Sequence, residues 1–205
     1  MINNKRANTY ILGGGYMKNV PDKGAAFYQA IIGNRTTANV LICCFAMSPD
    51  KWQEGFETDR DLITLFNGDI TLSLKCADMD SFTDQIDWAD IIIFRGGSSQ
   101  ELIARLNTIQ DWREHISHKT VVGASAGVYM LSSYYVVTDS TPRLTEGLGL
   151  LPIVVAAHYR STFIHDGDID KSRIFWDEVD KLMESQSEGR DIIKLREGEF
   201  LLYSE

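Results

Sequence analysis

The chain alternates between short apolar runs and longer amphipathic segments. The apolar runs have the length of strands, and the segments between them show helical spacing, which is typical of a largely parallel sheet covered by helices. The predicted strands are Thr9–Gly14, Ala38–Ala46, Asp69–Lys75, Asp90–Gly97, Thr120–Ser125, Ile153–His158 and a closing pair, Asp191–Glu197 and Phe200–Ser204. The pattern therefore predicts a layered α/β fold.

The amphipathic segments predict the helices that cover this sheet. They are Lys23–Ile32, Asp50–Asn67, Ser81–Ala89, Ser99–Ile116, Ser125–Val136 and Asp170–Ser185. Asp170 is placed to cap the start of the last helix. Proline and glycine interrupt the segment Thr138–Pro152, which we expect to be an irregular loop that folds back over a site. Because the chain shows no internal repeat and no linker, we expect residues 1–205 to form one domain.

Composition narrows the class of protein. The 205 residues are 44% hydrophobic and 24% charged, as in globular proteins, and no apolar run approaches the ~20 residues of a membrane helix. The net charge of −9 argues against nucleic acid as a partner. The three cysteines form no disulfide framework, and the N-terminal segment has no signal-peptide core, so we expect a cytoplasmic protein. The oligomeric state is left open.

The segment Gly123–Gly127, "GASAG", matches Gly-x-Ser-x-Gly between a predicted strand and a predicted helix. This is the context that a nucleophile elbow requires, because small residues on both sides of Ser125 let strand and helix approach closely and expose the hydroxyl group. A plain tight turn would explain the same residues. Ser125 is therefore a candidate nucleophile.

A serine hydroxyl needs a neighbouring base, for which histidine is the usual residue. His158 ends a predicted strand and would lie at the same sheet edge as Ser125 if the strands are parallel. His165, on the following loop, is an alternative base or a substrate contact. His115 and His118 precede the strand that leads to Ser125, so we expect them at the opposite end of the sheet and exposed to solvent.

A carboxylate would be needed to orient the imidazole. Between Ser125 and His158, the acidic residues are Asp139 and Glu146, both in the predicted irregular segment. Asp139 comes soon after the predicted helix and is favoured. A loop cap explains either residue equally well.

The glycine pair Gly96–Gly97 also follows a strand and opens a helix. Such a turn can direct the N–H of Gly97 toward the same point as the N–H of Ala126, and two converging N–H groups form an oxyanion hole. Nucleotide binding is the weaker interpretation, because no segment completes a dinucleotide or P-loop motif.

The acidic segment "HDGDID" resembles the start of a calcium loop in its spacing of Asp166, Asp168 and Asp170. Lys171 stands where that loop requires a glycine. We therefore expect a solvated loop, with no metal and no cofactor.

Three motifs in order, strand-"RGG"-helix, strand-"GASAG"-helix and strand-"AAH", resemble the serine peptidases of the dipeptidase E (aspartyl dipeptidase) and cyanophycinase family. The similarity extends to "KLREGEFLLYS", which resembles a late hairpin of that family. The resemblance implies a flavodoxin-like three-layer sandwich related to the class I glutamine amidotransferases, with serine in place of cysteine. The short interval between Ser125 and His158 also disfavours the α/β-hydrolase fold.

By this resemblance, Ser125 is the nucleophile, His158 its base and Asp139 the orienting acid, while Gly97 and Ala126 supply the oxyanion hole. The substrate would be a small peptide, including peptides that begin with aspartate. A cyanophycinase-like β-aspartyl peptidase and a non-catalytic binding or regulatory protein are the alternatives.

Two further residues are candidate substrate contacts. Arg160 follows His158 by two positions and could pair with an acidic side chain. Ser98 stands where the family often has asparagine, in a loop that helps line the substrate cleft. A surface role is the alternative for Arg160.

Overall fold

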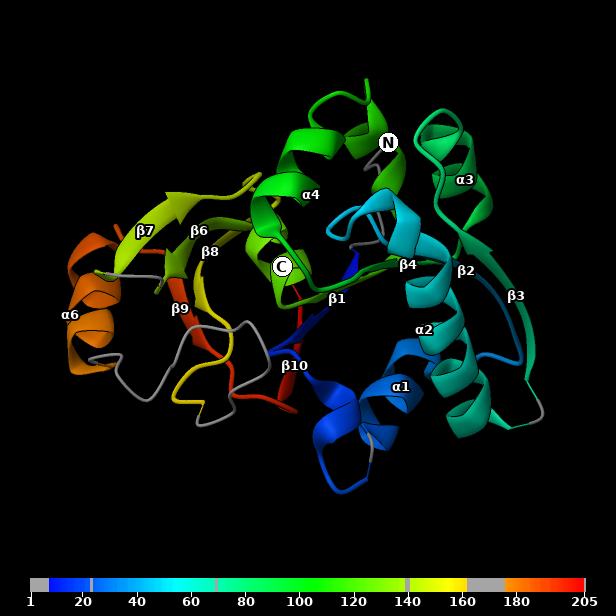
Figure 1. The fold of residues 1–205 in the computed structure, drawn as a ribbon, viewed down its shortest axis with the longest axis horizontal. Helices are drawn as coiled ribbons and strands as arrows, with labels where there is room; N and C mark the ends of the chain where they lie inside the picture. The colour runs from blue at the N-terminus through cyan, green and yellow to red at the C-terminus, as the bar shows by residue number, and fades with distance from the viewer. Residues whose placement is uncertain (1–7, 23, 69, 139–140, 162–175, 205) are drawn as a thin grey trace, which may run out of the picture.

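The computed structural model describes residues 8–22, 24–68, 70–138, 141–161 and 176–204. In these residues, a six-stranded sheet has the order β10-β1-β5-β4-β2-β3, and helices cover both of its faces (Figure 1). Its strands are β1 (Thr9–Gly13), β2 (Thr37–Cys43), β3 (Thr71–Cys76), β4 (Ile91–Phe94), β5 (Thr120–Ala124) and β10 (Phe200–Tyr203). The predicted α/β architecture with a largely parallel sheet is confirmed.

All neighbouring strands of this sheet are parallel except β10, which pairs antiparallel with β1. The central strand β4 is buried along its whole length, and β5 is buried up to its last residue. Continuous apolar runs are expected here, because helices exclude water from both faces of the strands. The parallel order brings the carboxyl ends of β4 and β5 to the same sheet edge.

Two helical layers enclose the sheet. On one face, α1 (Ala25–Ile32) and α2 (Trp52–Asn67) bury Ile31 and Ile63 against the strands. On the other face lie α3 (Phe82–Trp88), α4 (Ser99–Leu106) and α5 (Ala126–Leu131). Within the described residues, no helix is both long and apolar enough to cross a membrane.

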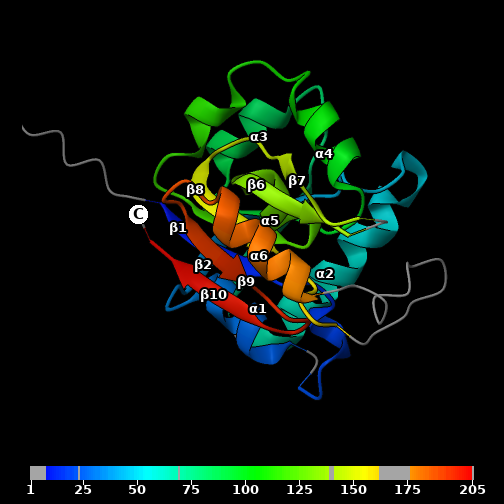
Figure 2. The same cartoon turned by 90° about the vertical axis from the view of Figure 1, so that its left-hand side faces the viewer.

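A second, four-stranded sheet has the order β7-β6-β8-β9. It consists of β6 (Ser132–Val137), β7 (Arg143–Glu146), β8 (Leu151–Ala156) and β9 (Asp191–Lys194). Helix α6 (Trp176–Gln186) lies across this sheet, where Val179 and Met183 pack against Val136 and Val154 (Figure 2). The second sheet was not predicted as a separate layer.

The structure corrects two parts of the sequence prediction around this sheet. The predicted helix Ser125–Val136 ends at Leu131, and the rest of it continues as β6. The predicted loop Thr138–Pro152 contains β7 and the start of β8. Residues such as Tyr135 and Val136 favour strands, and pairing with the distant β8 decides between the two conformations.

The closing pair is a further correction. β9 pairs with β8 in the second sheet, whereas β10 pairs with β1 in the main sheet. The segment between β9 and β10 therefore does not close a hairpin but leads from the second sheet to the main sheet. The long predicted helix Ser99–Ile116 is also divided, into α4 and a 3-10 helix at Trp112–Ile116. The proposed cap Asp170 lies outside the described residues.

Close packing around Gly127 supports the turn between β5 and α5. A Cβ atom at Gly127 would overlap the carbonyl oxygen of Phe94, which is backbone and cannot rotate away. We expect Gly127→Ala to lower the free energy of unfolding by about 2 kcal/mol, because overpacking displaces the helix from the strand. Urea unfolding measures this change.

Ala26 offers a matched control on the exposed side of α1. Ala26→Ser also adds one heavy atom, but it faces solvent and should alter the free energy of unfolding by less than about 0.5 kcal/mol. Equal stability of the Gly127→Ala variant and the parent would refute the packing argument.

Candidate active site

Ser125 lies on a sharp turn between β5 and α5. Its backbone has φ 54° and ψ −113°, a region that residues with a side chain rarely adopt. Two hydrogen bonds hold the turn: Ser125 N–H donates to Gly13 O at 3.0 Å, and Tyr129 N–H donates to Ser125 O at 3.1 Å. Ser125 therefore occupies a strained strand-to-helix turn, and its role as a nucleophile elbow stays a prediction.

Glycines make this turn possible. A Cβ atom at Gly123 would lie 2.7 Å from the carbonyl carbon of Gly127, and one at Gly96 would lie 3.1 Å from Ser125 Cβ. Strand, helix and the loop after β4 therefore meet at distances that only glycine allows. This packing places the Ser125 hydroxyl at the carboxyl edge of the main sheet.

The imidazole of His158 contacts that hydroxyl. His158 Nε2 lies 2.8 Å from Ser125 Oγ, and the His158 side chain is only 13% exposed. His158 follows β8 of the second sheet, and its backbone N–H donates to Gly14 O of the loop after β1 at 3.1 Å. The structure therefore brings the two predicted residues together.

Glu197 lies on the other side of the imidazole. Its Oε1 atom is 3.3 Å from His158 Nδ1 and also accepts a hydrogen bond from the Ser161 hydroxyl at 2.5 Å. A carboxylate at Nδ1 favours the tautomer that carries its proton there, which leaves Nε2 free to accept the proton of Ser125 Oγ. Serine, histidine and glutamate thus form a continuous chain of contacts.

Sequence reasoning did not single out Glu197, because the acid was sought between Ser125 and His158. The available signal was its position as the last residue of the predicted strand Asp191–Glu197, a strand end like the one that carries His158. The favoured acid, Asp139, lies outside the described residues, so its role stays a prediction. Glu146 is exposed at the end of β7.

The loop after β1 packs directly on the imidazole. A Cβ atom at Gly15, which has φ 103°, would overlap His158 Cε1, and the ring of Tyr16 lies 5.1 Å from the ring of His158. Gly15 O also accepts a hydrogen bond from Gly198 N–H, in the residue after Glu197. One glycine loop therefore contacts both the histidine and the segment that carries the glutamate.

Backbone donors lie beside the serine. Within the part of the chain that the structure describes, neither Gly97 N–H nor Ala126 N–H has a hydrogen-bond partner. Gly97 has φ 145°, and a Cβ atom there would overlap the carbonyl oxygen of Ala46. Gly97 lines the cavity, whereas Ala126 is buried, and the role of both N–H groups as oxyanion donors stays a prediction.

A cavity of about 640 Å³ opens onto Ser125 and His158. One part of it lies between α1 and α2 and is lined by residues such as Phe27 and Leu62. Another part is lined by Tyr129 and Tyr135, whose rings stack at 4.7 Å. A cavity of this size suits a small organic ligand.

A buried ion pair lines the part of the cavity between α1 and α2. Arg95 Nε lies 2.5 Å from Asp59 Oδ2, and their side chains are 19% and 12% exposed. Burial raises the pKa of Asp59 against the opposing effect of Arg95. Burial opposes the charge of Arg95 as well, but the charge and the hydrogen bond of Asp59 together raise the pKa of Arg95. Arg95 directly precedes Gly96 and Gly97, and it lines the same cavity as Ser125.

Two other predicted site residues, Ser98 and Arg160, are not among the described residues that line the cavity, and their roles as substrate contacts stay predictions. Ser98 uses its hydroxyl to accept Glu101 N–H at 3.2 Å, which caps α4, while the neighbouring Ser99 lines the cavity. Arg160 does not line the cavity and binds Tyr159 and acidic residues of α6.

His115 lies away from the serine. His115 Nδ1 lies 2.7 Å from Asp87 Oδ1, before the start of β5 and so at the end of that strand away from Ser125. His165 and the acidic segment 166–170 lie outside the described residues. Among the residues the structure does describe, no group of three His, Cys, Asp or Glu side chains could hold a metal ion.

Solved structures show the same fold. A peptidase from an acI-B1 Actinobacterium is 19% identical and superposes with a TM-score of 0.65 over 96% of this chain and 83% of that chain. A putative peptidase E protein from Listeria monocytogenes EGD-e is 14% identical, with a TM-score of 0.66 over 97% of this chain and 95% of that chain. At these identities, the likeness concerns the fold. A search of curated proteins finds no match.

The sequence itself matches a family model. Residues 54–205, which include all three members of the serine, histidine and glutamate chain, match the model of peptidase family S51. This match covers most of the chain and agrees with the predicted enzyme class. The chain therefore belongs to peptidase family S51 and is a serine peptidase.

Proposed function

We propose that this peptidase hydrolyses short peptides of the kind that dipeptidase E takes, with Ser125 as nucleophile, His158 as general base and Glu197 as orienting acid. The observation that carries the proposal is the 2.8 Å contact between Ser125 Oγ and His158 Nε2, with Glu197 at His158 Nδ1. This arrangement has the roles of a catalytic triad, which is recognised by geometry rather than by residue order.

In the first half of the reaction, Ser125 Oγ attacks the scissile carbonyl carbon while its proton passes to His158 Nε2. The carbonyl oxygen becomes an oxyanion, to which the N–H groups of Gly97 and Ala126 are the candidate donors. Collapse of this intermediate breaks the C–N bond, and His158 returns the proton to the leaving amine. The amine departs and leaves an ester on Ser125.

In the second half, water attacks the ester and gives its proton to His158 Nε2. Breakdown of the second tetrahedral intermediate releases the carboxylate product, and the proton returns to Ser125 Oγ. Throughout, the Glu197 carboxylate holds Nδ1–H and stabilises the imidazolium that forms at each step.

The cavity supports a preference for an acidic residue beside the scissile bond. Within the described residues, its charged lining consists of Arg95, Lys18 and Asp59, apart from His158. Two cations against one carboxylate leave local positive charge in a protein whose net charge is −9. Arg95, rather than Arg160, is thus the arginine placed to pair with a substrate carboxylate.

The nucleophile is tested by Ser125→Ala. This variant should fold normally and lose turnover of a dipeptide panel, because the hydroxyl that forms the acyl-enzyme is absent. A fluorophosphonate should label the parent and not the variant. Full activity of Ser125→Ala on these dipeptides would refute the nucleophile assignment.

The orienting acid is tested by comparing Glu197→Gln with Asp139→Asn. We expect Glu197→Gln to lower kcat by about 10³-fold or more, because an amide can no longer hold the required tautomer and stabilise imidazolium. Asp139→Asn should leave kcat within about twofold. The reverse ranking in steady-state kinetics would return the role to Asp139.

Substrate preference is tested with the double variant Asp59→Asn/Arg95→Met, which removes both charges and avoids a buried unpaired ion. The ratio of kcat/KM for Asp-x over Asn-x dipeptides should fall about tenfold, since the cation near the serine is lost. Arg160→Met is the control and should keep that ratio. An unchanged ratio in the double variant would exclude Arg95. A fall of the ratio in Arg160→Met would also count against Arg95 as the arginine that sets the preference.

The linkage preference is tested in the parent enzyme. Comparing kcat/KM for α- and β-linked Asp dipeptides distinguishes a cyanophycinase-like preference.

A further inference from the structure

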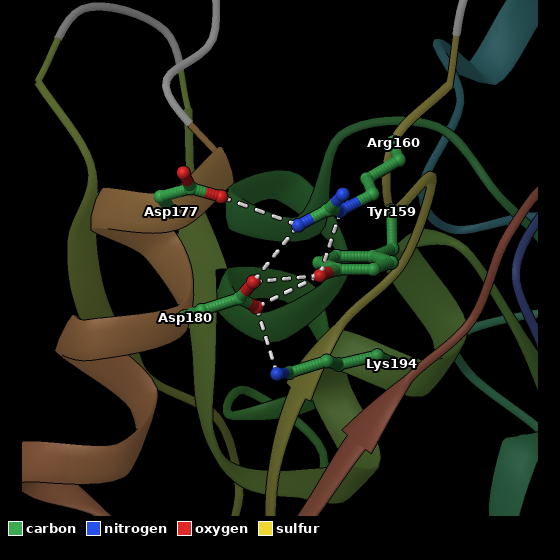
Figure 3. A network of polar contacts seen from close by, with 5 residues as sticks. All are labelled: Tyr159, Arg160, Asp177, Asp180 and Lys194. Carbon is green, nitrogen blue, oxygen red and sulfur yellow. Dashed lines mark hydrogen bonds and ion pairs between the residues drawn. The ribbon is translucent and has the colours of Figure 1, made fainter.

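A cluster of polar side chains lies between α6 and the second sheet (Figure 3). Asp180 of α6 is its centre. Its Oδ2 atom lies 2.8 Å from the Tyr159 hydroxyl and 3.2 Å from Arg160 Nη2, and its Oδ1 atom lies 2.7 Å from Lys194 Nζ. Arg160 Nε also donates to the Tyr159 hydroxyl at 2.9 Å. One carboxylate thus joins three donors.

These donors come from the two segments that carry the histidine and the glutamate. Tyr159 directly follows His158, and Lys194 precedes Glu197 by three residues at the end of β9. The two segments also pair through their backbones, since Tyr159 N–H donates to Leu195 O at 2.9 Å. Asp180 therefore binds both segments, the one that carries His158 and the one that carries Glu197.

The turn that carries His158 needs such support. His158 has φ 55° and Arg160 has φ 51°, so two residues with side chains adopt left-handed backbone within three positions. Each such residue costs on the order of 1 kcal/mol, and it persists where surrounding contacts define it fully. The Tyr159 side chain between them is buried and directed at Asp180.

The cluster stays charged at neutral pH. Burial opposes ionisation of Asp180, but hydrogen bonds from Lys194, Tyr159 and Arg160 outweigh it and lower the pKa of Asp180. The hydrogen bond to Asp180 raises the pKa of Lys194. The stabilisation is therefore lost only as pH falls through the lowered carboxyl pKa or rises through the raised ammonium pKa. Neither change occurs in the neutral range where a histidine base works.

We propose that Asp180 is a positioning residue that sets the contact between His158 and Glu197 by holding Tyr159 and Lys194. The proposal rests on the proposed function of His158 and Glu197 as base and orienting acid. Asp180 is not among the described residues that line the cavity. Its influence passes through the two catalytic side chains.

The test is Asp180→Asn, which keeps the shape of the side chain and removes its charge. We expect kcat to fall on the order of tenfold to a hundredfold with KM little changed, because small displacements of catalytic groups carry costs of this size. Folding is checked by circular dichroism and thermal unfolding. A purely structural role would lower the amount of folded enzyme and leave the kcat of the folded fraction unchanged.

A double-mutant cycle with Glu197→Gln shows whether the effect passes through the glutamate. If it does, Asp180→Asn should reduce kcat in the parent and add less than about twofold in the Glu197→Gln background. Fully multiplicative effects of the two changes would overturn the positioning role.

Asp177→Asn is the matched control. Asp177 lies on the same helix, its side chain is 88% exposed, and its ion-pair partner among the described residues is Arg160, at 3.3 Å. We expect kcat of this variant to match the parent. If Asp180→Asn does not fold, Tyr159→Phe removes the hydroxyl from the same cluster, and its kcat should fall while KM is retained.

Assays of the parent enzyme distinguish failure of the proposed function from failure of the positioning role of Asp180. A parent that hydrolyses no dipeptide and resists fluorophosphonate would refute the proposed function. An active parent whose Asp180→Asn or Tyr159→Phe variant keeps full kcat would overturn the positioning role alone.

Discussion

The hydrogen bond between Ser125 Oγ and His158 Nε2 joins the carboxyl edges of two separate sheets. Ser125 follows β5 of the main sheet, and His158 follows β8 of the second sheet. A contact of 2.8 Å requires both sheets to be placed accurately relative to each other. Much of the structure near the site serves this placement. Helix α5, which leaves the serine turn, leads directly into β6 of the second sheet.

The same region concentrates unfavourable backbone conformations. Ser125, His158 and Arg160 all have positive φ, and none of them is glycine. Nearby glycines bring their neighbours into close contact: Gly127 lies against Phe94, and Gly15 lies against His158. Such strain is common at active sites, where the surrounding packing holds side chains in positions that a relaxed chain would not select. The buried core on both faces of the main sheet supplies that packing.

The crossing from β9 to β10 completes the site. The chain leaves the second sheet after Lys194, passes His158 at Glu197, and enters the main sheet at Phe200. Glu197 is therefore fixed by the pairing of β9 with β8 on one side and of β10 with β1 on the other. The Asp180 cluster adds side-chain contacts to this backbone arrangement. The position of the Glu197 carboxylate thus depends on contacts between residues that are far apart in the sequence.

The sequence by itself determined the parallel α/β core, the turn between strand and helix at Ser125 and the histidine at a strand end. These features have local signals: continuous apolar runs, small residues around Ser125, and a polar residue that ends a buried strand. The tertiary structure alone decided the position of Glu197, the strand conformation of Ser132–Val137 and the separation of the closing strands. In each case, the deciding interaction joins residues far apart along the chain, as when β6 pairs with β8 or Glu197 meets His158. Local patterns do not contain such pairings, because the same apolar and aromatic residues suit a helix or a strand until a partner strand is present.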